Sequence, residues 1–179
     1  MRHAGKTYYA PDHFLETRLL IAVGAAEVLH RGLRIDEKPF PVEKFTEMRE
    51  DALKQVPEEY RAKFKGMLRN EPTLRSRLCA LAKRVDSQEI TDLLPDIDYW
   101  AKRTTQARNN LVHEGRTPEQ SVDELLAIVE TTTAVLILNI LKELGLPAGR
   151  QRRIVLCIPQ FRQASESANK WLRPPEAKS

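Results

Sequence analysis

Cysteine and glycine are scarce in this 179-residue chain, and both shortages narrow the range of folds. The two cysteines, Cys79 and Cys157, are too few for a disulfide framework, and neither belongs to a C-x-x-C pair. Each lies in an apolar helical context, so we expect two buried free thiols in a reducing compartment. Seven glycines and few clusters of β-branched residues argue against a sheet protein. The sequence therefore predicts an all-α fold, an antiparallel helical bundle.

The sequence also lacks the signatures of nucleotide, metal and membrane sites. It contains no G-x-x-x-x-G-K-[ST] loop and no G-x-G-x-x-G loop, and no set of His, Cys and carboxylate residues has metal-ligand spacing. We therefore expect no cofactor and no metal. The first residues are not followed by the apolar stretch of a signal peptide. The most apolar run, residues 134–141, is shorter than the roughly 20 residues that cross a bilayer, so we expect a cytoplasmic protein with no membrane segment.

Length and composition predict one helical domain. Domains typically have about 100–200 residues, and 41% hydrophobic residues are enough for a core. We expect a flexible lead-in over residues 1–10, a single domain over residues 11–172 and a disordered tail over residues 173–179. A net charge of +4 permits RNA binding without indicating it, because such a modest excess is common.

Hydrophobic positions recur at helical spacing along most of this domain. The predicted helices cover residues 12–31, 42–55, 58–69, 72–85, 87–94, 96–114, 118–144 and 154–172, the last broken at Pro159. The pieces over 42–69 form a helical insertion after the first helix, and this hairpin covers either a cleft or a dimer edge. Residues 150–153 are predicted to be a basic turn.

The helix predicted over residues 96–114 has two different faces. At 100° per residue, one stripe is mostly apolar and the other is polar. The apolar stripe consists of Ile97, Trp100, Thr104, Ala107 and Leu111. The polar stripe consists of Lys102, Gln106, Asn109 and His113, which differs from the Glu/Lys mixture of an ordinary solvated face. We expect the first helix, whose residues 22–26 are mostly small, to pack against this helix.

Residues 108–113 bring an arginine, two amides and a histidine within one and a half turns of this helix. Histidine changes charge near neutral pH and can take or give a proton there, while the arginine fork fits a phosphate. Together they suit phosphodiester chemistry. Arg108 lies roughly 140° around an ideal helix from His113, so one helix does not force them together. Two copies facing each other across a dimer close that gap.

The spacing of Arg108, a polar residue and His113 resembles the R-x4-H signature of the HEPN superfamily of ribonucleases and nucleotide-binding domains. The surroundings resemble the Apea-like branch. There, a segment like residues 72–81 precedes a helix that ends in an R-N-x-L-x-H motif, and a longer apolar helix follows. The resemblance covers residues 12–158 and implies a HEPN-like helical bundle.

The resemblance implies a metal-independent endoribonuclease that acts as a homodimer, with the motifs of two protomers in a shared cleft. His113 is then the general acid and base, Arg108 the phosphate clamp, and Asn109 orients the histidine ring or binds a phosphate oxygen. The ribose 2′-OH is the nucleophile, so DNA should resist cleavage. The further residues expected to contact RNA are Lys102, Gln106, Arg103 and Arg116. The family also suggests tRNA as a substrate and a role in antiphage defence or as a toxin.

Two other interpretations remain open. The chain is alternatively a non-catalytic HEPN module that dimerises or binds RNA or nucleotides with a partner protein. If it is unrelated to this family, Arg108 is an ion-pairing residue and His113 complements the helix dipole. Apea-like domains often follow a sensing domain, for which this chain has little room. We therefore expect an excised domain, a shortened relative, or a chain that relies on a partner protein.

Two sets of charged residues also have alternative interpretations. Glu27 either helps to orient Arg108 or pairs with Arg31 four residues later. The basic residues of the helix over 72–85 either face RNA or form an ordinary solvated face; they are Arg75, Arg77, Lys83 and Arg84.

Overall fold

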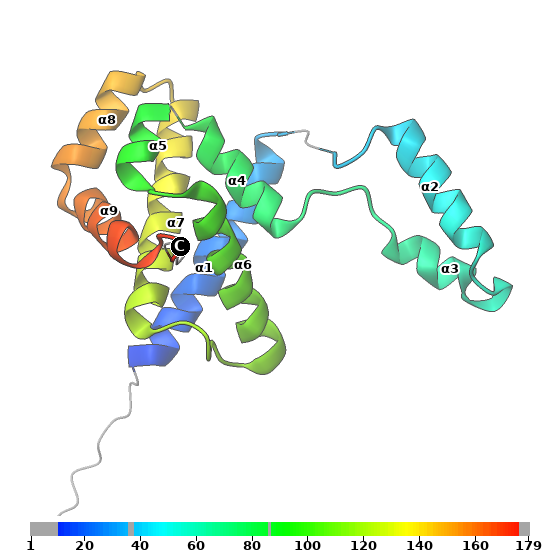
Figure 1. The fold of residues 1–179 in the computed structure, drawn as a ribbon. Coiled ribbons are helices and arrows are strands. Elements are labelled where there is room, and N and C mark those ends of the chain that lie inside the picture. Colours follow the sequence, from blue (N-terminus) through cyan, green and yellow to red (C-terminus); the bar gives the residue numbers. More distant parts are fainter. Residues whose placement is uncertain (1–10, 36–37, 86, 176–179) are drawn as a thin grey trace, which may run out of the picture. The chain divides into compact units, whose positions relative to one another are not determined.

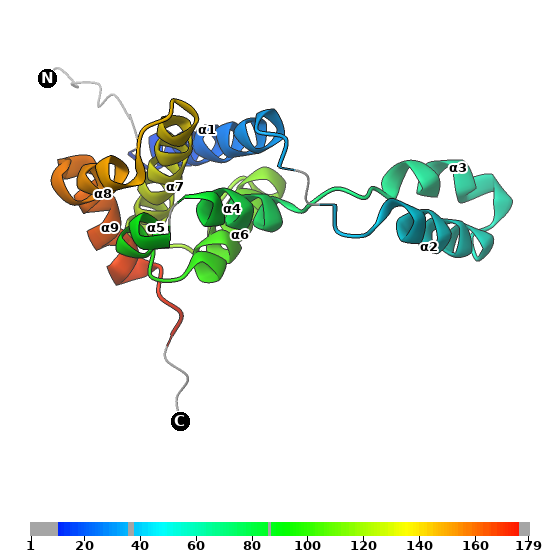
Figure 2. The same cartoon turned by 90° about the horizontal axis from the view of Figure 1, so that it is seen from above.

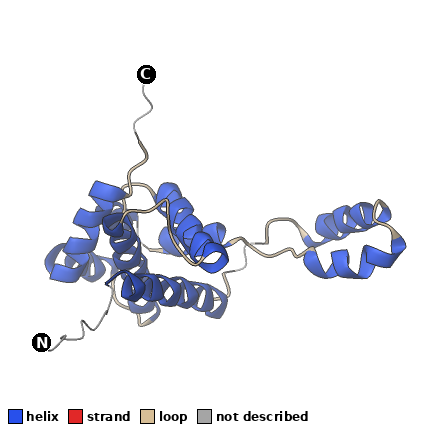
Figure 3. Cartoon of the chain, turned by 90° about the horizontal axis from the view of Figure 1, so that it is seen from below, coloured by secondary structure: helices blue, strands red, loops and turns tan. Residues whose placement is uncertain are grey.

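The computed structural model describes residues 11–35, 38–85 and 87–175. Within these residues every regular element is a helix and no strand is present, as Figure 3 shows. The predicted all-α class is therefore confirmed. The predicted lead-in over residues 1–10 and the last four residues of the predicted tail lie outside the described residues.

The nine helices of the described chain divide into two compact units. The core unit comprises Met1–Leu33 and Leu74–Ser179, and the insertion comprises Arg34–Thr73. The core helices, labelled in Figure 1, are α1 (Pro11–Gly32), α4 (Leu74–Arg84), α5 (Ser87–Leu93), α6 (Ile97–Glu114), α7 (Val122–Glu143), α8 (Ala148–Cys157) and α9 (Pro159–Trp171). The insertion holds α2 (Val42–Lys54) and α3 (Glu58–Met67), after the first helix as predicted.

The long apolar helix α7 is the central element of the core unit. It contacts α1, α4, α6, α8 and α9, and Figure 1 shows it running through the middle of that unit. Twelve of its 22 residues are buried, as expected of a helix with apolar side chains on most sides. It begins at Val122 and not at residue 118, because the Ser121 hydroxyl accepts a hydrogen bond from the Glu124 N–H at 3.1 Å and caps the helix there.

The length of α7 corrects one argument made from the sequence. Residues 134–141 alone are too short to cross a bilayer, but the whole helix is long and apolar enough to do so. Burial distinguishes a membrane-spanning helix from a core helix: 67% of the most apolar window of α7 is buried inside the protein. A core helix has this property, so its contacts with the surrounding helices account for its apolar composition.

The packed face of α1 includes the small-residue segment that was expected to pack, because Ala22, Val23 and Ala26 are buried. Its buried apolar residues are Leu15, Leu19, Ala22, Val23 and Ala26 among those whose burial is described, and His30 is buried in its last turn. By contrast, Ile21 and Val28 are 66% and 68% exposed. The helix does contact α6, but its main partner is α7. The buried stripe contains Leu15 and Leu19 as well as small residues, and burying the two leucines removes much apolar surface from water.

The helices at the C-terminal end of the core unit also correct a prediction. Residues 150–153, expected as a basic turn, lie inside α8, which follows Pro147. Pro159 is the first residue of α9, a position that proline favours. The two prolines therefore mark two helix starts. Arg152 donates from Nε to Asp92 Oδ2 at 3.1 Å, which ties α8 to α5.

The insertion is a helical hairpin closed by hydrogen bonds near each end. Asn70 Oδ1 accepts from the Phe40 N–H at 3.2 Å, and Asn70 Nδ2 donates to the Phe40 carbonyl at 2.8 Å. At the turn, Arg61 donates from Nε to the Val56 carbonyl at 2.9 Å. Figure 2 shows α2 and α3 side by side. Neither helix contains a buried residue, so the hairpin has no core of its own.

Candidate active site on helix α6

The motif residues occupy the last turns of α6, a helix with well-defined ends. Asp96 caps its start, with Oδ1 accepting from the Tyr99 N–H at 2.7 Å. Gly115 ends the helix in the left-handed conformation, with φ at 70°, and donates its N–H to the Leu111 carbonyl at 3.0 Å. Glycine adopts that conformation without steric cost. His113 therefore lies in the final turn, two residues before the chain changes direction.

The two faces of α6 are oriented as the periodicity predicts. The buried residues are Trp100, Ala101, Thr104 and Ala107, on the side that contacts α4, α1 and α7. In the polar stripe, Lys102 and His113 are exposed, and Gln106 and Asn109 are partly exposed. The candidate catalytic face is thus accessible to a ligand.

Within one protomer, Arg108 contacts Asn109. The guanidinium donates from Nη1 to Asn109 Oδ1 at 3.2 Å, and both side chains are partly buried. His113 is exposed and has no hydrogen-bond or ion-pair partner among the residues that the structure describes. The amide of Asn109 thus positions the arginine, and the histidine stands apart from both.

Two of the predicted RNA contacts, Arg103 and Gln106, are bonded inside the domain. Arg103 donates from Nε and Nη2 to the two carboxylate oxygens of Glu124, at 2.5 and 2.8 Å, and from Nη2 to the Glu119 carbonyl at 2.8 Å. Its Nη1 donates to Gln106 Oε1 at 3.0 Å, and Gln106 in turn donates to the Glu119 carboxylate. The hydrogen bond with Glu124 raises the pKa of Arg103.

This network holds the chain that follows the motif. It joins α6 to the first turn of α7 and to the segment between them, and the side chains of Arg103 and Glu124 are only 16% and 11% exposed. This network could not be predicted directly from the sequence, because a helical wheel shows the face of a helix but not the segment that folds back onto it. The one available signal was the Ser121-x-x-Glu124 spacing of a capping box.

The remaining predicted contacts are more accessible. Lys102 and Arg116 are exposed, and Arg116 lines a pocket of about 220 Å³ beside Thr117, Pro118 and Val122. Glu27 lies 3.7 Å from Arg31. Of its two interpretations, the structure thus displays the pairing within α1.

Of the four basic residues of α4, Arg75 and Lys83 are exposed, whereas Arg77 and Arg84 are part of the packed fold. Arg77 is buried. Arg84 donates to Asn139 Oδ1 at 3.4 Å and pairs with Glu143. Asn139, fully buried on α7, donates to the carbonyls of Leu81 and Val135. This end of α4 is therefore fastened to α7.

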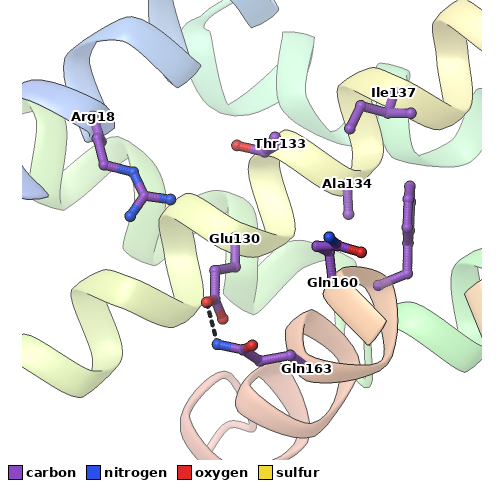
Figure 4. Close-up of a pocket in the computed structure, with 8 residues that line it drawn as sticks. Arg18, Glu130, Thr133, Ala134, Ile137, Gln160 and Gln163 are labelled. Atoms are coloured by element: carbon purple, nitrogen blue, oxygen red, sulfur yellow. Dashed lines mark hydrogen bonds between the residues drawn. The ribbon is translucent and has the colours of Figure 1, made fainter. Parts of the chain in front are cut away.

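A separate pocket lies between α1, α7 and α9, away from the motif residues. Figure 4 shows Arg18 from α1 and Gln160 and Gln163 from α9 around the polar and apolar side chains of α7. Gln163 donates to Glu130 at 2.7 Å. The volume is about 240 Å³, below the roughly 300 Å³ at which small-molecule sites begin. We assign it no function.

The cysteines differ from each other, and neither belongs to a metal centre. Cys79 is buried as expected, but Cys157 is exposed, so the prediction of a buried thiol is wrong for Cys157. Burial, with a hydrogen bond to Asp98, raises the pKa of Cys79 to about 11. In the part of the chain that the structure describes, no group of three or more His, Cys, Asp or Glu side chains is arranged to hold a metal ion.

Comparison with known protein families identifies the class of this helical bundle. The family model for the Apea-like HEPN domain matches residues 20–150, which include α6 and the whole motif. This chain belongs to the Apea-like HEPN family. HEPN domains are generally associated with ribonuclease activity, and they commonly dimerise and bind RNA. Searches of curated proteins and of solved structures found no match.

Proposed function

We propose that this protein is an endoribonuclease that works as a homodimer and needs no metal ion. One observation carries the proposal: the stretch that the family model matches contains Arg108 and His113 at the R-x4-H spacing, and His113 is exposed in the last turn of a helix with a defined cap at each end. An exposed imidazole at a fixed position can reach a substrate backbone. RNA in the cytoplasm, with tRNA as the first candidate, is the proposed substrate.

The proposed reaction uses the RNA's own 2′-OH as the nucleophile. His113 removes the proton from this hydroxyl, and the oxygen attacks the adjacent phosphorus. The bond from phosphorus to the 5′-oxygen breaks, and that oxygen takes up a proton. The products are a 2′,3′-cyclic phosphate and a 5′-hydroxyl. Arg108 stabilises the negative charge that develops on the phosphoryl oxygens, and Asn109 holds its guanidinium in place through the 3.2 Å hydrogen bond.

A second protomer supplies what one α6 helix lacks. In one protomer Arg108 is bonded to Asn109, and His113 lies about 140° further round the helix. When two motif helices face each other, Arg108 lies opposite the partner's His113, and both groups reach one phosphate. Lys102 and Arg116 are exposed and extend the contact with the RNA backbone. Arg103 and Gln106 are omitted from this surface because their polar groups bind Glu119 and Glu124.

Cleavage of a tRNA pool in excess EDTA tests the proposal. Wild-type protein should produce fragments with cyclic-phosphate ends, and a DNA strand of matching sequence should stay intact. The His113→Ala variant should keep its helical content and dimeric state but cleave about 10²–10⁴-fold more slowly, the usual cost of losing an acid–base group. Glu114→Ala, one residue further on and also exposed to solvent, is the matched control and should cleave normally.

The outcomes are distinct. Normal cleavage by a folded His113→Ala variant contradicts the role of His113, whereas loss of wild-type cleavage in EDTA contradicts metal independence. A wider role in antiphage defence or as a toxin predicts that expression of the active protein, and not of the variant, arrests translation.

A non-catalytic HEPN module is the second candidate, and one observation favours it. Among the described residues His113 has no partner that would fix its ring or its tautomer, so a lone protomer has no preorganised acid–base pair. This function predicts RNA binding that survives the His113→Ala change, with no cleavage by the wild-type protein.

A further inference from the structure

The insertion exposes large apolar side chains along both of its helices. They are Phe40, Val42, Met48, Tyr60, Phe64 and Met67, and they are 38–68% exposed. On α3 the residues Tyr60, Phe64 and Met67 follow the i, i+4, i+7 spacing of a single helix face. Burying such side chains is a main source of folding free energy. This face of α3 leaves its apolar surface in water, so covering it would be favourable.

The hairpin is too small to form a core from its own residues. Its helices have 13 and 10 residues and contain no buried residue. Isolated helices shorter than about 12–15 residues are marginal in water, and a two-helix hairpin needs a further surface against which to pack. The apolar face of α3 formed by Tyr60, Phe64 and Met67 is therefore a candidate contact surface.

The charges of the insertion favour a protein over a nucleic acid as its cover. Residues 34–73 contain nine basic and nine acidic residues, so they have no net attraction for a phosphate backbone. The two helices carry opposite small excesses: four acidic and three basic residues in α2, and two acidic and three basic residues in α3. When two identical hairpins pair about a two-fold axis, α2 of each can lie against α3 of the other, so the excesses attract.

We propose that the insertion of a second copy of this chain covers this face, forming an intermolecular four-helix bundle. The pairing gives the homodimer a second interface besides the motif helices. It rests on the proposed function only for the dimer and does not require RNA cleavage. The hairpin would then act as a dimerisation arm that brings two catalytic helices together.

Photocrosslinking of the full-length chain tests this pairing. A benzophenone maleimide is attached at the Met67→Cys position in a Cys157→Ser background; Met67 is 68% exposed, and Cys79 is buried. Equal amounts of unlabelled and nitrogen-15-labelled protein are mixed before irradiation, so that crosslinks between copies can be told from crosslinks within one copy. Crosslinks should join two copies and should map to residues 34–73 of the second copy.

Matched variants and added RNA make the outcome specific. Phe64→Glu should lower the yield of these crosslinks about tenfold, because it removes the burial of one large apolar side chain. Leu144→Glu, the same kind of change at a 76% exposed position of the core unit, should leave the yield unchanged. Crosslinks confined to one copy, or to the core unit of the second copy, overturn the proposal. Attachment to RNA when a tRNA pool is present also overturns it, in favour of a nucleic-acid surface.

RNA cleavage measured on the same labelled Met67→Cys protein in the Cys157→Ser background, before irradiation, separates this proposal from the enzymatic one. Crosslinked arms without cleavage contradict the ribonuclease and leave the arm standing. Cleavage without crosslinks between the arms contradicts the arm alone.

Discussion

Arg103 shows how a residue on the candidate face can serve the fold instead of the ligand. Its guanidinium makes a bidentate contact with Glu124, and both side chains are largely buried. A buried pair is costly to break, because removing one partner leaves an uncompensated charge in a poorly solvated place. Stability, more than RNA affinity, should therefore respond to a change at Arg103.

Replacing Arg103 by Ala should lower the free energy of unfolding by about 3 kcal/mol, the lower end of the range for breaking a buried ion pair. Urea unfolding followed by circular dichroism measures the change. Arg31→Ala is the matched control, because its contact with Glu27 is 3.7 Å long and the arginine side chain is 60% exposed. That control should change the stability by less than about 1 kcal/mol. Equal effects of the two changes would mean that the Arg103 network is not structural.

The two cysteines should differ sharply in reactivity. The pKa of Cys79 is raised to about 11, chiefly by burial, so this thiol stays protonated at pH 8. The thiolate is the reactive form, and only about 0.1% of such a thiol is ionised at pH 8. Iodoacetamide should therefore label the exposed Cys157 in native protein and label Cys79 only after denaturation, as peptide mass spectrometry can show. Rapid native labelling of Cys79 would contradict its burial on α4 beside Asp98.

For single residues, the sequence predicted which side chains are buried or exposed better than it predicted their hydrogen-bond partners. The exposure of Lys102 and His113 and the burial of Trp100 follow from helical periodicity. The contact between Arg108 and Asn109 is local and could have been expected from adjacent polar side chains. The bonding of Arg103 to Glu119 and Glu124 could not, because it depends on a segment that folds back from beyond Gly115.

At the scale of single helices, both the ends and the buried face of α6 follow from the sequence, whereas α7 begins at Val122 and not at residue 118 as predicted. Asp96 and Gly115 mark the ends of α6 as predicted, because capping is a local interaction between neighbouring residues. The small residues 22–26 of α1 indicated its contact with α6, but the larger contact of α1 with α7 was not expected. The segment 150–153 was misassigned as a turn because its basic charge was considered and its helix propensity was not. Arginine and glutamine both form helices well, and the segment lies inside α8.

The helices of the insertion should be the least stable elements of the described chain. Neither α2 nor α3 has a buried residue, whereas α7 has twelve. In hydrogen exchange measured by mass spectrometry, amides of α2 and α3 should exchange at least about 100-fold faster than those of α7 in dilute protein. Protection should rise with protein concentration if a second copy covers the hairpin. Protection equal to that of α7 at the lowest concentration would show that the hairpin is already packed within its own chain.

At the scale of the whole molecule, the family and the all-helical bundle could be predicted because they follow from helical periodicity and one motif. The division into a core unit and an insertion was only partly predictable. The sequence marked the hairpin by its prolines, but the lack of buried residues in α2 and α3 is a property of packing. The proposed site requires two protomers, because Arg108 of one protomer is expected to act with His113 of the other.

Mixing two inactive variants tests this central claim most directly. Arg108→Ala and His113→Ala homodimers are purified separately, shown to be folded, and combined under conditions in which protomers exchange. If the arginine of one protomer works with the histidine of the other, a mixed dimer contains one site in which both residues are intact. Cleavage of a tRNA pool in excess EDTA should then return in the mixture, while each variant alone stays inactive. A mixture of exchanged protomers that is as inactive as its components would contradict the shared site.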